Sequence, residues 1–183
     1  VDVVDEFVEI VGGIDALVCL NGAIHFSGHW MNIPAAMWER DIDLNLNQTF
    51  YLARAAMKEM KREGKGGRII LNGTESALHG GSAQSLPYAV AKRGTECLVQ
   101  GLAREGAPEN ILVNGVRLGY ISSGFHQRWH GRSERDLADR AALVPLKRGG
   151  LPEEVAALII YLLSGWAGFI TGQMIPITGG DWL

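Results

Sequence analysis

The sequence contains little cysteine, no long apolar run and no block of basic residues, and each absence excludes a class of protein. Its two cysteines, Cys19 and Cys97, both lie in apolar stretches. This usage is typical of buried thiols in a reducing compartment rather than of a disulfide framework, so we expect a cytoplasmic protein. No apolar run approaches the roughly 18 residues of a membrane span, and no charged-then-apolar leader favours secretion.

Charge and composition also exclude several functions. The net charge is −3, and the basic residues are scattered, which predicts neither a nucleic-acid face nor a polybasic membrane patch. Two histidine pairs have a spacing of four, His25 with His29 and His126 with His130. Both pairs lack the glutamate of an HExxH motif and lie in predicted loops, so we expect no metal site. With 47% hydrophobic residues, 183 residues suffice for one domain with a core.

Strand and helix patterns alternate along the chain. Continuous apolar runs predict buried strands at 15–20, 67–72 and 111–116, and Pro176 within a short last strand at 173–177 favours a sheet edge. Helical patterns occupy 4–11, most of 34–64, 88–105 and 152–164. The alternation predicts an α/β fold with a parallel sheet and helices on both faces, in a single domain over 1–183. The polar, glycine-punctuated segment 118–150 is predicted to be a substrate loop or lid.

The stretch "YAVAK" places a phenol and an ammonium on one face of a predicted helix. Tyr88 and Lys92 are four residues apart, which brings their side chains together. A free phenol has a pKa of about 10, and a neighbouring cation lowers it, so the pair is typical of a proton-transfer site. The alternative is an ordinary helix with an exposed lysine and a half-buried tyrosine. Hydroxyls follow the preceding strand at Thr74 and Ser76. These two could form a simple turn or act as a hydrolase nucleophile, although the G-x-S-x-G spacing fails.

Five elements in order resemble the short-chain dehydrogenase/reductase family over nearly the whole chain. They are "YAVAK", "LVCLNGA" after the first strand, "DLNLNQTF" in the long helix, "NILVNGVRLG" around the third strand and "FITGQMIPITGG" near the C-terminus. The resemblance implies a partial Rossmann-like doubly wound parallel sheet, corresponding to the C-terminal two-thirds of the family's domain. It also implies an enzyme that uses NAD or NADP to move a hydride to or from a small-molecule alcohol or carbonyl substrate.

The resemblance also implies residue roles. Tyr88 would be the general acid/base, and Lys92 would lower its pKa and bind the nicotinamide ribose. Thr74, preferred over Ser76 by register, would polarise the substrate oxygen, and Asn45 would hold a water of the proton relay. The further residues matched to cofactor contacts are Asn21, Gly22, Gly119 and Ile121.

The sequence departs from the family pattern at several positions. Cys19-Leu20-Asn21-Gly22 stands where the family has Asn-Asn-Ala-Gly, so Leu20 replaces a bracing asparagine unless Asn21 takes over its role. Leu118-Gly119 replaces Pro-Gly. No glycine-rich phosphate loop occurs at a strand-to-helix junction.

Two hypotheses follow from the missing loop. In the first, the chain belongs to an active oxidoreductase whose cofactor-binding part lies upstream. In the second, it is a naturally truncated, inactive homologue that acts as an oligomeric or binding module. By the resemblance, the helices near 38–62 and 88–105 would pack against another subunit, which predicts a homodimer or homotetramer.

Overall fold

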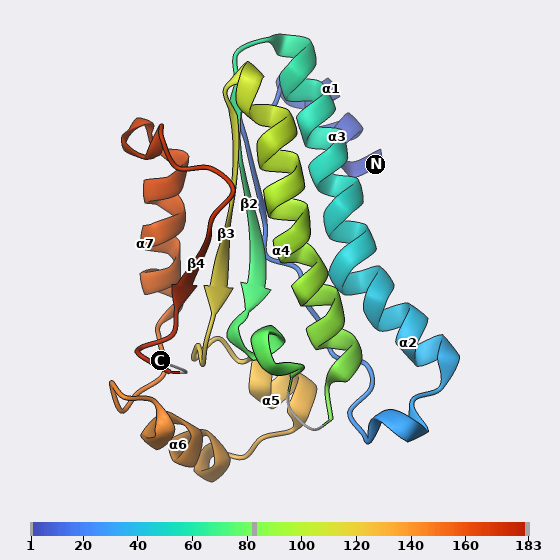
Figure 1. Cartoon of the computed structure of the whole chain (residues 1–183), viewed down its shortest axis with the longest axis vertical. Helices are drawn as coiled ribbons and strands as arrows, with labels where there is room; N and C mark the ends of the chain where they lie inside the picture. The colour runs from blue at the N-terminus through green and yellow to red at the C-terminus, as the bar shows by residue number, and fades with distance from the viewer. Residues whose placement is uncertain (1, 82–83, 182–183) are drawn as a thin grey trace.

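The computed structural model describes residues 2–81 and 84–181, and a parallel sheet of four strands forms its centre. The strands lie in the order of the chain: β1 (Ala16–Cys19), β2 (Gly67–Thr74), β3 (Ile111–Leu118) and β4 (Met174–Ile177). All neighbours pair in parallel, so their carboxyl ends meet at one edge of the sheet, which is the lower edge in Figure 1. The predicted α/β fold with a parallel sheet is therefore confirmed.

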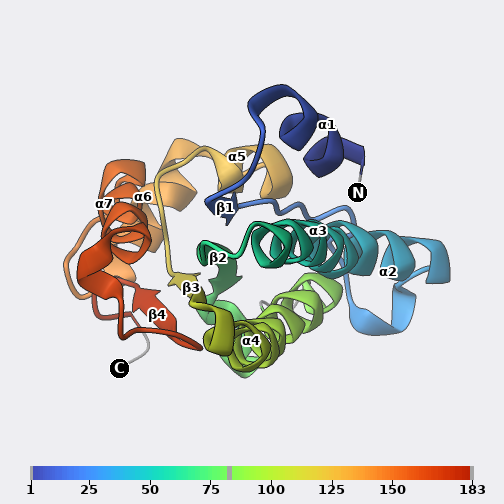
Figure 2. The ribbon, with the colours of Figure 1, turned by 90° about the horizontal axis from the view of Figure 1, so that it is seen from above.

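Helices cover the two faces of the sheet unequally. One face packs against α3 (Gln48–Glu63) and α4 (Leu86–Gly106), and the other packs against α7 (Pro152–Leu163), as Figure 2 shows. The chain enters the sheet through α1 (Asp2–Val11), while α2 (Ala35–Ile42) and the π-helical segment η2 (Asp43–Asn47) lead into α3. Short 3-10 turns are η1 (Trp30–Asn32), η3 (Glu75–His79), η4 (Ala107–Glu109) and η5 (Gly165–Ala167). Among the described residues, no helix is both long and apolar enough to cross a membrane.

Alternation along β2 and β3 creates a core on each face of the sheet. Successive side chains of a strand point to opposite faces, so a strand that is apolar throughout serves two cores. Ile69 and Val113 belong to the core under α3 and α4, whereas Ile70 and Val116 belong to the core under α7. The central strands β2 and β3 are thus fixed from both sides, and their carboxyl ends form a rigid platform.

β1 differs from the central strands because it lies at an edge of this sheet. It pairs with β2, and Val18 in the strand and Leu20 directly after it are 40% and 49% exposed. Cys19, on the opposite side of the strand, is buried against α3.

The segment 118–150 is more regular than its sequence predicts. It contains two helices, α5 (Phe125–His130) and α6 (Glu134–Leu143), which lie below the carboxyl ends of the strands (Figure 1). The start of α6 is fixed by a capping box: Asp136 N donates to Ser133 Oγ at 3.2 Å, and Ser133 N donates to Asp136 Oδ2 at 3.0 Å. This reciprocal pair satisfies two backbone donors, so a helix can begin within a polar sequence.

Candidate active site

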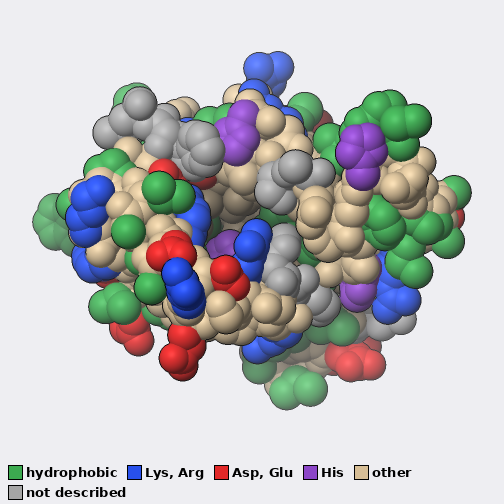
Figure 3. All heavy atoms as spheres, turned by 90° about the horizontal axis from the view of Figure 1, so that it is seen from below, with side chains coloured by type: hydrophobic (Ala, Val, Ile, Leu, Met, Phe, Trp, Pro, Cys, Tyr) green, Lys and Arg blue, Asp and Glu red, His purple; other side chains and the backbone are tan. Residues whose placement is uncertain are grey.

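A cavity of about 950 Å³ opens at the carboxyl ends of the strands. Its wall is shared between the ends of β2 and β3, the start of α4 and the segment that contains α5 and α6. Figure 3 views the molecule from this end, where acidic and basic side chains are mixed and histidines lie among them. Parallel α/β proteins bind ligands at this edge, because loops and helix N-termini converge there. The residues of the predicted site that line the cavity are Gly22, Thr74, Ser76, Tyr88, Gly119 and Ile121.

Tyr88 projects from the first turn of α4 into this cavity. Its side chain is 8% exposed, hydrogen-bonds with Thr74 and lies 5.9 Å from the ring of Phe125 on α5, measured between centroids. Burial raises the pKa of Tyr88 well above its ordinary value, and the hydrogen bond with Thr74 offsets part of this rise. The expected lowering of this pKa by Lys92 is not met here, because desolvation of the phenol dominates.

Lys92 is fully buried one turn further along α4. Its Nζ donates to Asn21 O and to Asn72 Oδ1, both at 2.7 Å, and makes a longer contact of 3.4 Å to Asn72 O. Burial lowers the pKa of Lys92 to about 8, because the desolvated ammonium has neutral hydrogen-bond partners. The ammonium lies 5.9 Å from the centroid of the Tyr88 ring. We call Lys92, Asn21 and Asn72 the amide cluster.

Thr74 is the last residue of β2, and its hydroxyl lies between several partners. Thr74 Oγ1 is 3.1 Å from Ser76 Oγ and 3.4 Å from Leu118 O, and it also bonds with Tyr88. Ser76 lies in η3, the 3-10 turn that follows. Both residues line the cavity. The hydrogen bond with Tyr88 favours Thr74 over Ser76 as the hydroxyl that acts with the tyrosine.

Asn45 lies in the π-helical segment η2 and is completely buried. Its Nδ2 donates to Ala23 O and Asp41 O, both at 2.8 Å, and its Oδ1 accepts from Ala23 N at 3.0 Å. The wider turn of a π-helix is often found at functional sites. Here the carboxamide fastens the loop after β1 to the long helix, so its side chain acts as a brace in this structure.

Gly119 and Gly22, two glycines of the predicted site, differ in how much space the structure leaves for a side chain. A Cβ on Gly119 would lie 2.9 Å from Thr178 Cα, which is too close for any side chain. A Cβ on Gly22 would lie 3.6 Å from Lys92 Nζ and Asn45 Oδ1, an ordinary contact. The fold itself therefore requires Gly119, whereas Gly22 leaves a part of the cavity wall open that the fold does not need. Ile121, beyond Gly119, bridges to Gly150 and lines the same wall.

Comparison with known proteins agrees with this geometry. A family model described as "Enoyl-(Acyl carrier protein) reductase" matches residues 1–181. The chain belongs to the short-chain dehydrogenase/reductase family.

Individual members of the short-chain dehydrogenase/reductase family show how far the likeness extends. "Dehydrogenase/reductase SDR family member 4" of Bos taurus is 30% identical over 175 residues, which cover 95% of this chain and 61% of the relative. "L-rhamnose 1-dehydrogenase (NAD(P)(+))" of Azotobacter vinelandii is 32% identical over 174 residues, covering 94% and 66%. The crystal structure of a short-chain type dehydrogenase/reductase from Mycobacterium marinum superposes with a TM-score of 0.88 at 32% identity, covering 99% of this chain and 70% of that one. The chain thus spans less than two thirds of the length of the first two relatives.

The structure resolves one departure from the short-chain dehydrogenase/reductase pattern. Asn21 Nδ2 donates to Leu44 O at 2.7 Å, while its Oδ1 accepts from Cys19 Sγ at 2.9 Å and Thr49 Oγ1 at 3.1 Å. These bonds tie the end of β1 to η2 and α3. The side chain of Asn21 thus connects β1 to the helices, whereas Leu20 is half exposed at the cavity.

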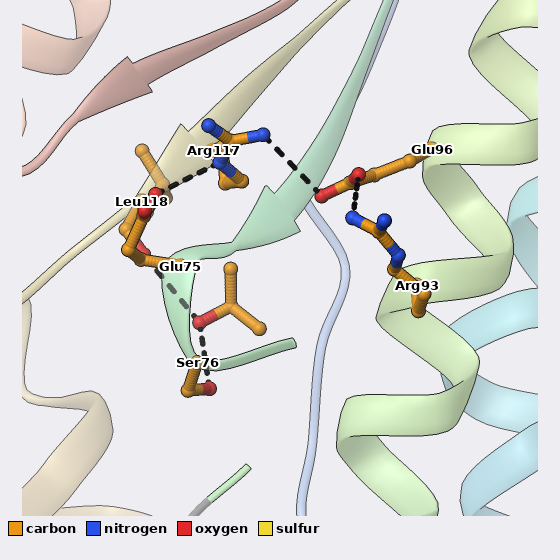
Figure 4. Close-up of polar contacts among 7 residues, drawn as sticks. Glu75, Ser76, Arg93, Glu96, Arg117 and Leu118 are labelled. Carbon is orange, nitrogen blue, oxygen red and sulfur yellow. Dashed lines mark hydrogen bonds and ion pairs between the residues drawn. The ribbon is translucent and has the colours of Figure 1, made fainter. Parts of the chain in front are cut away.

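Sequence reasoning missed a chain of charged residues on the other side of β2. Arg117 Nε donates to Glu75 Oε2 at 2.8 Å, and Arg117 Nη1 lies 3.8 Å from Glu96 Oε1. Arg93 Nη1 contacts the second oxygen of Glu96 at 2.5 Å. Figure 4 shows these four side chains bridging α4 and the ends of β2 and β3, and we call them the ion-pair chain. The sequence feature that could have indicated the ion-pair chain is a charged residue beside each predicted site residue, since Glu75 follows Thr74 and Arg117 precedes Leu118-Gly119.

The rest of the cavity wall comes from the segment after β1, from the residues between β3 and α6, and from α7. Tyr120 and His126 rings lie 5.3 Å apart, and Arg140 forms an ion pair with Asp181 while lying 5.8 Å from the Tyr120 ring. Among the described residues, no group of three or more metal-binding side chains is present, and the side chain of His130 lies outside that set. His29 accepts a bond from Met31 N at the start of η1.

Proposed function

We propose that this chain carries the catalytic centre of an NAD(P)-dependent oxidoreductase that acts on a small alcohol or carbonyl compound. The observation that carries the proposal is the buried Tyr88 phenol, which is hydrogen-bonded with Thr74 in a large cavity and has the Lys92 cation one helical turn away. Two relatives bear names of dehydrogenases or reductases, one of them with NAD(P)(+). Since the chain spans 61% and 66% of these relatives, the activity of the whole protein is a proposal.

The residues present fit the nicotinamide end of such a cofactor. Gly22 leaves the wall open beside Lys92, and Gly119 and Ile121 present backbone along the same cavity. Lys92 has the donors for a ribose diol, provided that it exchanges a present partner for it. When bound, a nicotinamide cofactor supplies or accepts the hydride.

The proton is the part of the reaction that these side chains would perform. A substrate oxygen placed between the hydroxyls of Thr74 and Tyr88 would accept hydrogen bonds from both, and Tyr88 would give up its proton as the carbonyl becomes a carbinol. The raised pKa keeps Tyr88 protonated at neutral pH, which is the form that carbonyl reduction requires. The reverse reaction requires the phenolate, and burial of the phenol opposes its formation.

The test is Tyr88→Phe, which removes one hydroxyl and preserves the ring. We expect the turnover number for a ketone or alcohol reduced or oxidised with NAD(P)H or NAD(P)⁺ to fall about 10²–10⁴-fold, the usual contribution of a positioned acid or base. Tyr161→Phe on the exposed side of α7 is the matched control and should turn over normally. Unchanged turnover in Tyr88→Phe would end the proposal. Titration of the protein with NADH and NADPH tests the inactive-module hypothesis, because tight binding counts against it.

A further inference from the structure

Asn72 is a polar residue inside β2, and neither the family resemblance nor the proposed chemistry gives it a role. It lies two residues before Thr74, is buried, and lines the cavity. Lys92, in contrast, does not line the cavity within the described part of the chain, although it is the residue expected to reach the ribose. The side chain that faces both the ammonium and the cavity is therefore Asn72.

The contacts of Lys92 show what Asn72 does. Of the two short bonds of Nζ, one goes to a backbone carbonyl, Asn21 O, and the other to the side chain oxygen Asn72 Oδ1. The backbone bond persists whatever residue occupies position 21, since any residue supplies a carbonyl. The bond to Asn72 is the one that a substitution can remove, and it sets the direction in which the ammonium points.

We propose that Asn72 is a positioning residue, whose side-chain oxygen holds the Lys92 ammonium directly behind the cavity wall and stands in for the ribose hydroxyl that would otherwise bind there. The inference rests on the proposed function for the identity of that hydroxyl. The contact itself can be tested without any turnover.

The chemistry of the acceptor matters because the ammonium is desolvated. A carboxylate would hold the cation tightly and keep it charged at every physiological pH, whereas an amide oxygen stabilises it less and remains replaceable by a ligand oxygen. An apolar residue would leave a buried charge with only backbone partners. The titratable groups that face Lys92 are the Cys19 thiol on β1 and the Tyr88 phenol on α4, and β2 contributes Asn72. The lowered pKa of Lys92 agrees with a neutral partner.

The experiment measures the pKa of the Lys92 ammonium by NMR of the ¹⁵N- and ¹³C-labelled protein. Its signal is assigned by its loss in Lys92→Met, and the other lysines, which are exposed, serve as internal references: Lys58, Lys61, Lys65 and Lys147. Asn72→Leu removes the acceptor at nearly constant volume, and Asn72→Asp keeps an acceptor and adds a charge.

We expect the pKa of Lys92 to fall by about one unit or more in Asn72→Leu and to rise by about as much in Asn72→Asp, since a bond to a charged group is worth at least that shift. The matched control is Asn114→Leu on β3, because Asn114 is also buried and bonds Ile170 O and Gln173 N, not Lys92. The assignment is overturned if Lys92 titrates within about 0.3 unit of the wild type in the Asn72 variants, or if the control shifts it equally. Should the leucine variant not fold, the aspartate variant alone decides.

A kinetic arm separates a positioning role from a purely structural one. If turnover depends on charged Lys92, the falling limb of the rate–pH profile should move to lower pH in Asn72→Leu and to higher pH in Asn72→Asp. Loss of activity without movement of either limb contradicts the positioning role. Absence of turnover in the wild type would overturn the proposed function and leave the NMR result to decide the Lys92–Asn72 contact.

Discussion

The carboxyl end of β2 separates two sets of polar side chains, most of them buried or half-buried, that differ in how their charges are neutralised. In the amide cluster, the single cation Lys92 is held by the neutral oxygens of Asn21 and Asn72. In the ion-pair chain, two arginines and two glutamates alternate, so that charges of opposite sign are adjacent. Both sets include a residue of α4 and a residue at or directly after the end of β2.

The difference shows how one helix can present a reactive group and remain rigid. A buried charge without a counter-ion pays a desolvation cost that appears as a lowered pKa, and this leaves Lys92 able to lose its proton near pH 8. Removing one partner of a buried ion pair leaves an uncompensated charge, so such a pair disfavours separation of the elements that carry it. We infer that the amide cluster is built for proton chemistry and the ion-pair chain for holding Thr74 and Gly119 in place.

Removal of the arginine at the centre of the ion-pair chain should have the largest effect. Arg117→Met leaves the carboxylate of Glu75 without its cation and removes the nearby charge from Glu96. Breaking a buried pair typically costs about 3–5 kcal/mol, so we expect the free energy of unfolding in urea to fall by about that amount. Arg93→Met is the control, because the Arg93 side chain is 56% exposed and its pair should contribute about 1 kcal/mol or less. Equal decreases in the free energy of unfolding of both variants would show that Arg117 is no more important to the ion-pair chain than the exposed Arg93.

Removal of the lone cation should instead have an effect that depends on pH. The folded protein holds Lys92 with a pKa of about 8, whereas the ordinary value is 10.5, so above pH 8 the folded state loses its proton before the unfolded state does. The wild type therefore carries the full cost of the buried charge below pH 8, and this cost is relieved as the pH rises from 8 to 10.5. Relative to Lys92→Met, wild-type stability should rise by up to about 3 kcal/mol across that window.

Urea unfolding of both proteins between pH 7 and 10 measures this difference. Cys19 and the tyrosines of the unfolded state titrate in part of this range, but both proteins contain them, so the difference between the two curves reports Lys92. Lys58→Met on the exposed side of α3 is the control and should follow the wild type at every pH. A difference between wild type and Lys92→Met that stays constant with pH would mean that Lys92 titrates normally and that the amide cluster is open to water.

The two sets also differ in how far the sequence predicts them. The strands and the helix of Tyr88 follow from local patterns: the predicted helix 88–105 is Leu86–Gly106 in the structure, and the predicted strand 111–116 is Ile111–Leu118. Because Tyr88 and Lys92 share a helix, their proximity is local as well, and the strand that ends at Thr74 brings the hydroxyl to them. Register alone could therefore select Thr74 over Ser76.

The remaining features depend on contacts between distant parts of the chain. Arg117 and Glu75 are 42 residues apart, and Lys92 and Asn72 are 20 apart, so no periodicity signals either pair. Asn72 is a single asparagine in an apolar strand, and no sequence pattern distinguishes it from other asparagines. The residues around Asn45 likewise do not distinguish a π-helical turn from an ordinary helix. The helix α6 could have been predicted, since Ser133 and Asp136 have the spacing of a capping box. The effect of burial on the pKa of Tyr88 could not, because it depends on what covers the phenol.

The smallest expected effect on stability is that of a cysteine substitution. The reaction rates of the two thiols report whether water reaches the amide cluster. Cys19 is buried and its pKa is raised by desolvation, while Cys97 lies exposed on α4. Since the thiolate is the reactive form, we expect Cys97 to react with a disulfide reagent in the native protein at least about a hundredfold faster than Cys19. Cys97→Ser should remove the fast phase and change stability by less than about 0.5 kcal/mol, because it is a surface substitution. Fast reaction of Cys19 in that variant would show that water reaches Lys92 and Asn21. The amide cluster would then not hold a desolvated cation, and its contrast with the ion-pair chain would be lost.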